Sequence, residues 1–218
     1  FVYEQSDTAP YLKIMIDENL FPLLKAQVDG KELIIGPKKI KENSRNGNSY
    51  NLQPTKFKVI TNSREIKELN VVSSGDFIIA SPINIGKLEI NMAGSGNILL
   101  EKKVEGNKLE INLASSGSVV ASNIDLAGIE CSLAGSGYIQ IAGKADRAEY
   151  NLAASGNIKA YECVTGKTEC NIAGSGNIQT HTRNQLEANI VGSGNVYYKG
   201  NPTTSKSIIG SGKLKSAN

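Results

Sequence analysis

The chain has 218 residues, a formal net charge of +3 and a hydrophobic content of 39 %. This length fits one elongated domain, or one domain with a small cap, and so weak a positive charge argues against a nucleic-acid-binding protein. Aromatic residues make up 6 %, Trp is absent and Gly reaches 22 residues. Such a composition favours thin layers of aliphatic side chains over a bulky globular core.

The start of the chain and its cysteines bear on location. The sequence begins at Phe1 without Met or a signal peptide, so we expect a mature or trimmed chain. No run of about 18 apolar residues occurs, so we expect no transmembrane segment. Cys131, Cys163 and Cys170 are odd in number and lack CxxC spacing. They are expected to be small buried hydrophobes, not a disulfide framework or a zinc site.

Residues 1–63 are predicted to form a β cap that begins the fold. Residues 11–16 alternate in polarity and predict a strand, and residues 19–25 favour a helical turn. Asp29-Gly30 between two apolar stretches is a hairpin signal. Residues 36–55 are polar and basic, which predicts a mobile loop. A strand resumes at residues 57–59.

From residue 64 onward a Ser-Gly pair recurs every 18 to 21 residues. An internal period of this length is the signature of a repeat architecture. The eight serines are Ser74, Ser95, Ser116, Ser136, Ser155, Ser175, Ser193 and Ser211.

Apolar residues flank each Ser-Gly pair with a period of two. The third residues before and after each Ser are apolar, and the fifth and seventh before it mostly are, which predicts two short strands per repeat. One repeat cannot bury its apolar face alone, but stacked repeats form a continuous interior. The sequence therefore predicts an all-β parallel β-helix or solenoid of about eight ~20-residue repeats. Residues 64–218 would form it, as a single continuous domain with the cap.

The Ser-Gly pair is interpreted as a structural corner. We expect each Gly to adopt a positive φ, at which it carries no Cβ penalty. Asn often follows, and a second Asn column lies four residues before the Ser, so stacked side-chain amides are expected to form ladders. The candidate corner residues are Ser95, Gly96, Asn97, Gly117, Gly137, Gly156, Gly176, Asn177 and Gly194.

A column of glutamates lies six residues before the Ser. Seven stacked carboxylates would repel one another, and Lys or Arg two residues earlier in several repeats would offset that repulsion. The column is therefore either a solvated, charge-paired face or an acidic stripe that binds cations or a basic partner. The candidate stripe is Glu89, Glu110, Glu130, Glu149, Glu169 and Glu187.

Catalysis is not expected. A Ser nucleophile would be needed once, whereas this Ser occurs eight times outside a strand–GxSxG–helix context. Pectinase-like enzymes on β-helices place acidic and basic clusters in long loops, which are lacking here, and no pair of glutamates stands out. The Gly-Gly-x-Gly-x-Asp of calcium-binding rolls is absent, and His181 is the only His. We therefore expect no catalytic residue, cofactor or metal.

The N-terminal pattern and the serial corners together resemble a known family. The segment YLKIMIDENLFPLLKAQVDGKELIIG, preceded by Tyr3-Glu4-Gln5 and followed by SGSGNI-like corners, is similar to the putative auto-transporter adhesin family with the head GIN domain. The resemblance covers nearly the whole chain. It implies a right-handed β-solenoid in exported proteins of Gram-negative bacteria, often anchored as outer-membrane lipoproteins, and it brings no catalytic residues.

Three functions remain open from the sequence. The leading hypothesis is a cell-envelope adhesin or binding module that contacts a glycan or a cell-surface protein. Tyr138, Tyr161, Tyr197 and Tyr198 would offer a stacking surface to a sugar or another chain, or are scattered rim aromatics. The second hypothesis is a carbohydrate-active enzyme on a β-helix. The third is a structural spacer or the head of an oligomer.

Overall fold

A computed structural model describes residues 1–39 and 52–217. The chain divides into two compact units, one formed by Phe1–Tyr11 with Thr61–Asn218 and the other by Leu12–Ile60. We call them the solenoid unit and the N-terminal unit, and describe each by itself.

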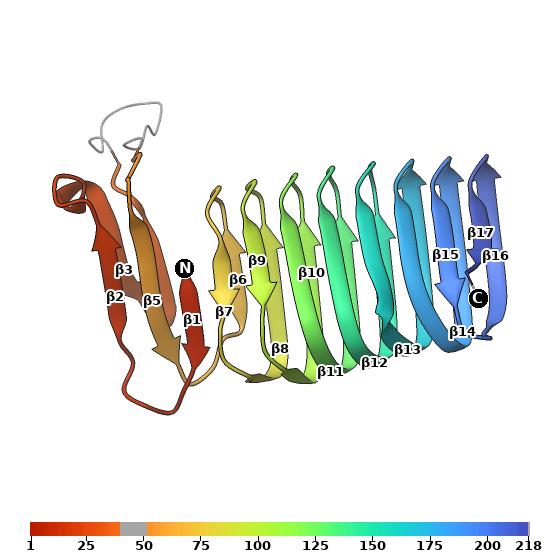
Figure 1. The fold of residues 1–218 in the computed structure, drawn as a ribbon, viewed down its shortest axis with the longest axis horizontal. Helices are drawn as coiled ribbons and strands as arrows, with labels where there is room; N and C mark the ends of the chain where they lie inside the picture. Colours follow the sequence, from red (N-terminus) through yellow and green to blue (C-terminus); the bar gives the residue numbers. More distant parts are fainter. Residues whose placement is uncertain (40–51, 218) are drawn as a thin grey trace. The chain divides into compact units, whose positions relative to one another are not determined.

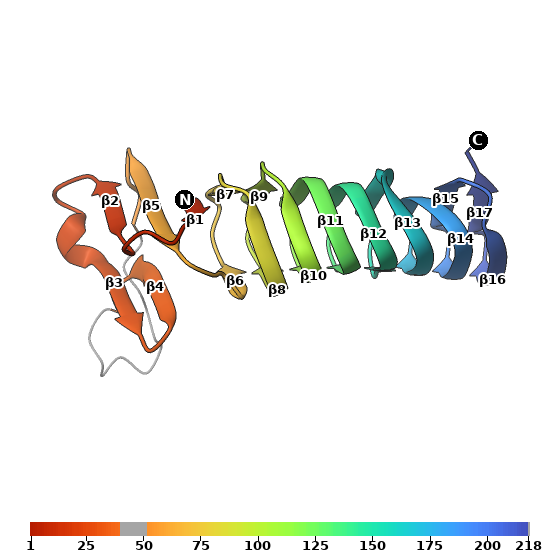
Figure 2. The same ribbon diagram turned by 90° about the horizontal axis from the view of Figure 1, so that it is seen from below.

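The solenoid unit is a stack of parallel coils, as the sequence predicts (Figures 1 and 2). About seven turns are present. Each coil carries a strand segment before its Ser-Gly corner and another after it. In the later coils the segment after one corner continues into the segment before the next corner, and the two form one long strand. We call the bend between them, opposite the Ser-Gly corner, the far bend. The strands are β1 (Val2–Gln5), β6 (Glu68–Val71), β7 (Phe77–Ile79), β8 (Ile83–Met92), β9 (Asn97–Leu100), β10 (Val104–Leu113), β11 (Ser118–Leu133), β12 (Tyr138–Leu152), β13 (Asn157–Gly174), β14 (Asn177–Gly192), β15 (Asn195–Lys199), β16 (Thr203–Gly210) and β17 (Lys213–Ser216). Strand β5 (Phe57–Ser63) crosses the boundary between the two units.

Equivalent residues of successive repeats lie directly beside one another. Leu113 of β10 pairs with Leu133 of β11, and Leu133 pairs with Leu152 of β12. The same register relates Glu110 to Glu130. At positions such as these, a substitution meets the same residue type in the coils on both sides. The predicted stacking of repeats is therefore confirmed.

Aliphatic ladders fill the interior of the coils. The buried core runs without interruption from the first coil to Val196 and is built mainly from Ile, Leu and Val. Each such side chain contributes roughly 1.5–3 kcal/mol when it is fully buried. The three cysteines lie buried and unpaired in this core, as expected.

The explanation predicted for the corner glycines is wrong. Positive φ values occur at other glycines, such as Gly106 and Gly143, and not at the Gly of any Ser-Gly pair. Their role is to let backbones approach: a Cβ on Gly137 would lie 2.1 Å from the carbonyl oxygen of Gly117 in the preceding coil. Equivalent clashes of 2.1–2.5 Å would arise at Gly96, Gly117, Gly156, Gly176, Gly194 and Gly212. The first copy, Gly75, meets only the Ser73 hydroxyl at 3.8 Å.

Side-chain amide ladders run along the stack, as predicted. In the column four residues before the Ser, each Asn donates to the Asn of the preceding coil over 2.9–3.0 Å, in the runs Asn112 to Asn91 to Asn70 and Asn189 to Asn171 to Asn151. Ser132 stands between these runs, in register with Asn112 and Asn151. The second column gives shorter runs, including Asn195 to Asn177 to Asn157.

The N-terminal unit is small and also rich in β structure. Its elements are β2 (Leu12–Ile16), the 3₁₀ helix η1 (Phe21–Leu23), β3 (Leu24–Asp29) and β4 (Glu32–Pro37). The predicted hairpin is confirmed, because β3 and β4 pair antiparallel around Gly30, which has a φ of 60°. The predicted helical turn is η1. Most of the predicted basic loop, including Lys41 and Arg45, lies outside the described residues.

Candidate binding groove

The glutamate column forms a continuous line on the outer face of the solenoid. Every member of the predicted stripe pairs in register with the next, from Glu89 in β8 to Glu187 in β14. Most of these carboxylates accept a hydrogen bond from the Asn two residues later in the same strand, for example from Asn151 to Glu149 over 2.9 Å. The amide ladder therefore positions the carboxylate column beside it.

Ion pairing along this column is uneven. Lys87 lies 3.2 Å from Glu89 and 3.0 Å from Glu110, and Lys108 lies 3.6 Å from Glu110 and 2.8 Å from Glu130. The predicted offset of acidic by basic residues therefore holds in the early coils.

In the later coils the offset is missing. Within residues 52–217, Glu149, Glu169 and Glu187 form no ion pair, although Arg147 and Lys167 stand two residues before the first two of them. Each of these three carboxylates accepts an Asn hydrogen bond on Oε1 alone. Their Oε2 atoms remain available to a ligand.

The pKa values in the early coils reflect this pairing. The Lys87 ammonium, which donates to Glu110, holds the pKa of that carboxyl below its usual value. At Glu89 the hydrogen bond from Asn91 lowers the pKa first, and Lys87 adds to it. The Lys108 pKa is raised, chiefly by its hydrogen bond to Glu130. The early part of the column is thus an internally neutralised network.

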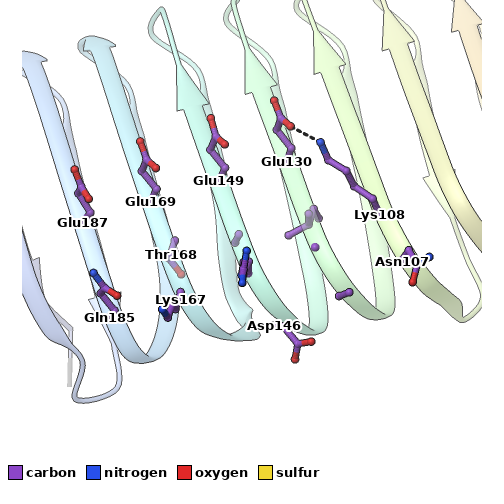
Figure 3. Close-up of a pocket in the computed structure, with 15 residues that line it drawn as sticks. Asn107, Lys108, Glu130, Asp146, Glu149, Lys167, Thr168, Glu169, Gln185 and Glu187 are labelled. Atoms are coloured by element: carbon purple, nitrogen blue, oxygen red, sulfur yellow. Dashed lines mark hydrogen bonds and ion pairs between the residues drawn. The ribbon is translucent and has the colours of Figure 1, made fainter.

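A depression of about 740 Å³ lies over the later part of the same face (Figure 3). Its lining includes Gly128, which interrupts the basic column and sits in register between Lys108 and Arg147. With Ala127 beside it, Gly128 leaves the surface without a long side chain. Figure 3 shows Glu130, Glu149, Glu169 and Glu187 in a row across four neighbouring strands, with Asp146, Lys167 and Gln185 nearer the far bend. We call this depression the acidic groove.

The acidic groove can bind a ligand through hydrogen bonds and charge. It offers carboxylate acceptors along one side and donors such as Arg147, Lys167 and Gln185 along the other. Among the described residues, no group of three or more His, Cys, Asp or Glu side chains is arranged to hold a metal ion. The arrangement is that of an elongated polar surface, not of a compact coordination site.

The structure places the predicted aromatic residues on the strand segments that follow the corners. Lys159 lies 4.6 Å from the ring centre of Tyr138, Lys199 lies 4.8 Å from that of Tyr161, and a third lysine covers Tyr197. Cation–π contacts of this kind occupy a ring face. Tyr138 also borders a second, smaller depression of about 340 Å³ in which Ile78, Leu99 and Val120 are neighbours along the stack.

A polar network inside the core escaped the sequence analysis. The Thr168 hydroxyl bonds those of Thr165 and Thr182 over 2.6 and 2.7 Å, and Thr180 joins at 3.2 Å. All four side chains are buried. Thr168 and Thr180 stand at column positions that are aliphatic in most other repeats. These polar residues in aliphatic columns were the feature of the sequence from which the network could have been predicted.

A tyrosine and the cysteines form a second unusual group in the interior. Tyr150 lies in register between Cys131 and Cys170, and within the described part of the chain its buried hydroxyl has no nitrogen or oxygen partner and faces the Cys163 thiol, a weak acceptor. Burial raises the pKa of the Cys163 thiol to about 11. Thiols in this state are protonated at neutral pH and unreactive.

Comparison with known proteins gives the family. A family model described as "Putative auto-transporter adhesin, head GIN domain" matches residues 1–106 and again residues 93–202. The chain belongs to this family. The two overlapping matches together cover most of the chain. A search of curated proteins found no match.

Solved structures of similar proteins agree with the head GIN assignment. The chain is 53 % identical to a protein described as "Putative lipid binding protein" from Parabacteroides distasonis ATCC 8503, with a TM-score of 0.97 over 100 % of this chain and 88 % of that one. It is 33 % identical to a "putative adhesin" from Parabacteroides merdae ATCC 43184, with a TM-score of 0.87 over 100 % and 87 %. A "putative adhesin" from P. distasonis is 30 % identical, with a TM-score of 0.91 over 99 % and 87 %.

Within the described residues, no helix has the length and apolar character needed to cross a bilayer.

Proposed function

We propose that this head GIN protein is an exported cell-envelope module that binds a glycan or a cell-surface protein in the acidic groove, without catalysis. The observation that carries the proposal is the coincidence of three features on one face: the depression, the break in the basic column at Gly128, and the unpaired carboxylates from Glu149 to Glu187. A face whose charged groups already pair with one another has few free hydrogen-bonding groups for a ligand. The later coils, in contrast, leave carboxylate acceptors free.

The family supports binding more than chemistry. Its description and those of the similar structures name adhesion or lipid binding, and none names a reaction. The glutamates of the groove occupy equivalent places in successive coils, so no pair of them is set apart as a general acid and its partner. We infer location at the surface or in the periplasm of a Gram-negative bacterium, with a lipoprotein anchor as the proposed attachment.

The decisive variant is Gly128→Lys. A Cβ at Gly128 meets nothing within 4 Å, and its φ is not positive, so a lysine is accommodated and projects into the groove. It would restore the basic column and occupy the depression. Gly86→Lys is the matched control, because Gly86 is equally unobstructed and does not line the groove.

The assays are a glycan array and a cell-binding assay with the full chain. We expect Gly128→Lys to abolish the signal that the parent chain gives and Gly86→Lys to preserve it. Glu149→Gln with Glu169→Gln should weaken binding, whereas Glu68→Gln, in the same column outside the groove, should not. Equal loss in both glycine variants, or no signal from the parent chain on either assay, contradicts the proposal. Turnover on a polysaccharide panel would instead favour the enzyme hypothesis.

A further inference from the structure

The N-terminal unit exposes an unusual amount of apolar side chain for its size. Among its described residues, 12–39 and 52–60, only Leu24 and Val59 are buried hydrophobics. Six large apolar side chains of the unit are exposed: Leu12, Met15, Phe21, Val28, Leu33 and Phe57. Exposed apolar surface concentrated in this way usually marks an interaction site.

The hairpin β3–β4 has one face made entirely of apolar residues. The register pairs Leu24 with Pro37, Ala26 with Ile35, and Val28 with Leu33, and residues two apart on one strand share a face with their partners. We call this set the hairpin face. The opposite face carries Lys25, Gln27, Asp29 and Glu32, with Ile34 and Gly36.

The Leu, Ile and Val side chains of the hairpin face become more exposed toward its turn. Leu24 at the base is 8 % exposed, whereas Leu33 is 37 % and Val28 is 70 % exposed. An isolated two-stranded hairpin is marginally stable in water, and covering its apolar face would stabilise it. The turn half of the hairpin face, Val28 and Leu33, is therefore the part that a partner would cover.

Charge indicates what kind of partner this is. Residues 12–39 and 52–60 contain seven Lys and four Asp or Glu, a net charge of +3. By the same count, residues 1–11 and 61–218 hold 15 basic and 16 acidic residues, a net charge of −1. Lys31 lies in the hairpin turn beside the exposed half of the hairpin face, between Asp29 and Glu32, and the positive excess of the unit comes from lysines outside the hairpin.

We propose that the hairpin face docks on the surface of a membrane that contains anionic lipid, with Val28 and Leu33 entering the interface and Lys31 facing the headgroups. Peripheral binding of this kind gains from buried apolar area and from attraction between lysines and anionic lipids. A second copy of the chain is the less favoured occupant, because two such surfaces would bring like net charges together.

The test is co-sedimentation of the full chain with vesicles of phosphatidylcholine alone and with about 30 % phosphatidylglycerol, at low and high salt. We expect binding to the anionic vesicles that weakens with salt, and little binding to the neutral ones. Val28→Ser combined with Leu33→Ser should lower the partition coefficient at least about tenfold. Lys31→Glu should lower it about fivefold or more.

Matched controls lie in the solenoid unit. Val72 is 82 % exposed, and Lys102 is also exposed. Val72→Ser and Lys102→Glu should leave vesicle binding unchanged, and circular dichroism should show every variant folded. Equal binding to neutral and anionic vesicles, or equal loss in the control variants, overturns the proposal. Absence of vesicle binding also overturns the proposal. In that case, a dimer that light scattering detects and that Val28→Ser with Leu33→Ser disrupts would identify a second copy of the chain as the occupant. Because the glycan array contains no membrane and the vesicles contain no glycan, the two proposals can fail separately.

Discussion

Replacing Gly137 by Ala tests whether close backbone approach explains the corner glycines. The new Cβ would lie 2.1 Å from the Gly117 carbonyl oxygen, well inside van der Waals contact. The coils must separate locally, which weakens the hydrogen bonds from Tyr138 N to Gly117 O and from Asn157 N to Gly137 O, now 3.3 and 3.2 Å long. Overpacking costs about 1–3 kcal/mol, and each weakened hydrogen bond adds up to about 1 kcal/mol. We expect a loss of roughly 2–4 kcal/mol.

Gly75→Ala is the internal control for this experiment. Gly75 has the same Ser before it and the same non-positive φ, but a Cβ there meets only the Ser73 hydroxyl at 3.8 Å. Without a clash, Gly→Ala stabilises by about 0.4–1 kcal/mol through the unfolded chain. Thermal melts followed by circular dichroism should separate the two variants by at least about 5 °C. If Gly137→Ala melts within about 1 °C of Gly75→Ala, the close-approach explanation is refuted.

Three further predictions concern the interior and the charge network. Tyr150→Phe removes a buried hydroxyl that has no nitrogen or oxygen partner in the described structure and faces only the weakly accepting Cys163 thiol, so the protein should melt at the same or a higher temperature, and a marked drop would show that this thiol is a stabilising partner. Thr168→Val leaves buried hydroxyls, Thr182 among them, short of a partner and should cost about 1–3 kcal/mol in urea unfolding, whereas an unchanged midpoint would contradict the network. The lowered pKa of Glu110 means that its ion pair stabilises the fold above the unfolded-state pKa and that this contribution is lost as the pH falls through the folded-state value. The Lys87→Met variant should therefore have a lower melting temperature than the parent at neutral pH, and this difference should vanish in acid. A difference in melting temperature that stays constant with pH would contradict a stabilising ion pair at Glu110.

Much of the solenoid could be predicted because its repeat is short and regular. The Ser-Gly spacing alone gives the register that pairs Leu113 with Leu133, and period-two apolarity gives the buried ladders. The reason why glycine recurs at the Ser-Gly corners could not be predicted from the spacing or the apolar pattern. A Gly required by φ and a Gly required by a neighbouring backbone look identical in sequence, and only the distance from Gly137 to the preceding coil distinguishes them.

Only part of the acidic groove could be predicted from the sequence. The stripe of glutamates was recognised, but the break at Gly128 and the difference between paired and unpaired carboxylates depend on side-chain conformations. Arg147 stands where a partner for Glu149 was expected, yet no ion pair forms there in the described structure. The Thr168 network, by contrast, could have been predicted from the sequence, because Thr168 is a polar residue in a column that is mostly aliphatic.

The repeats also separate structural from functional positions within one chain, because each column offers several residues in equivalent surroundings. The Gly of the corner never varies, and a backbone clash explains it in every copy except the first, Gly75. The Asn column is nearly constant, and its amide ladder explains that. The column two residues before the glutamates is different: from Lys108 it passes through Gly128, Arg147 and Lys167 to Gln185, although each of these residues pairs with the next. The fold does not require any one of these side chains, so this column is free to adapt to a ligand, and it borders the acidic groove where its side chains are most varied.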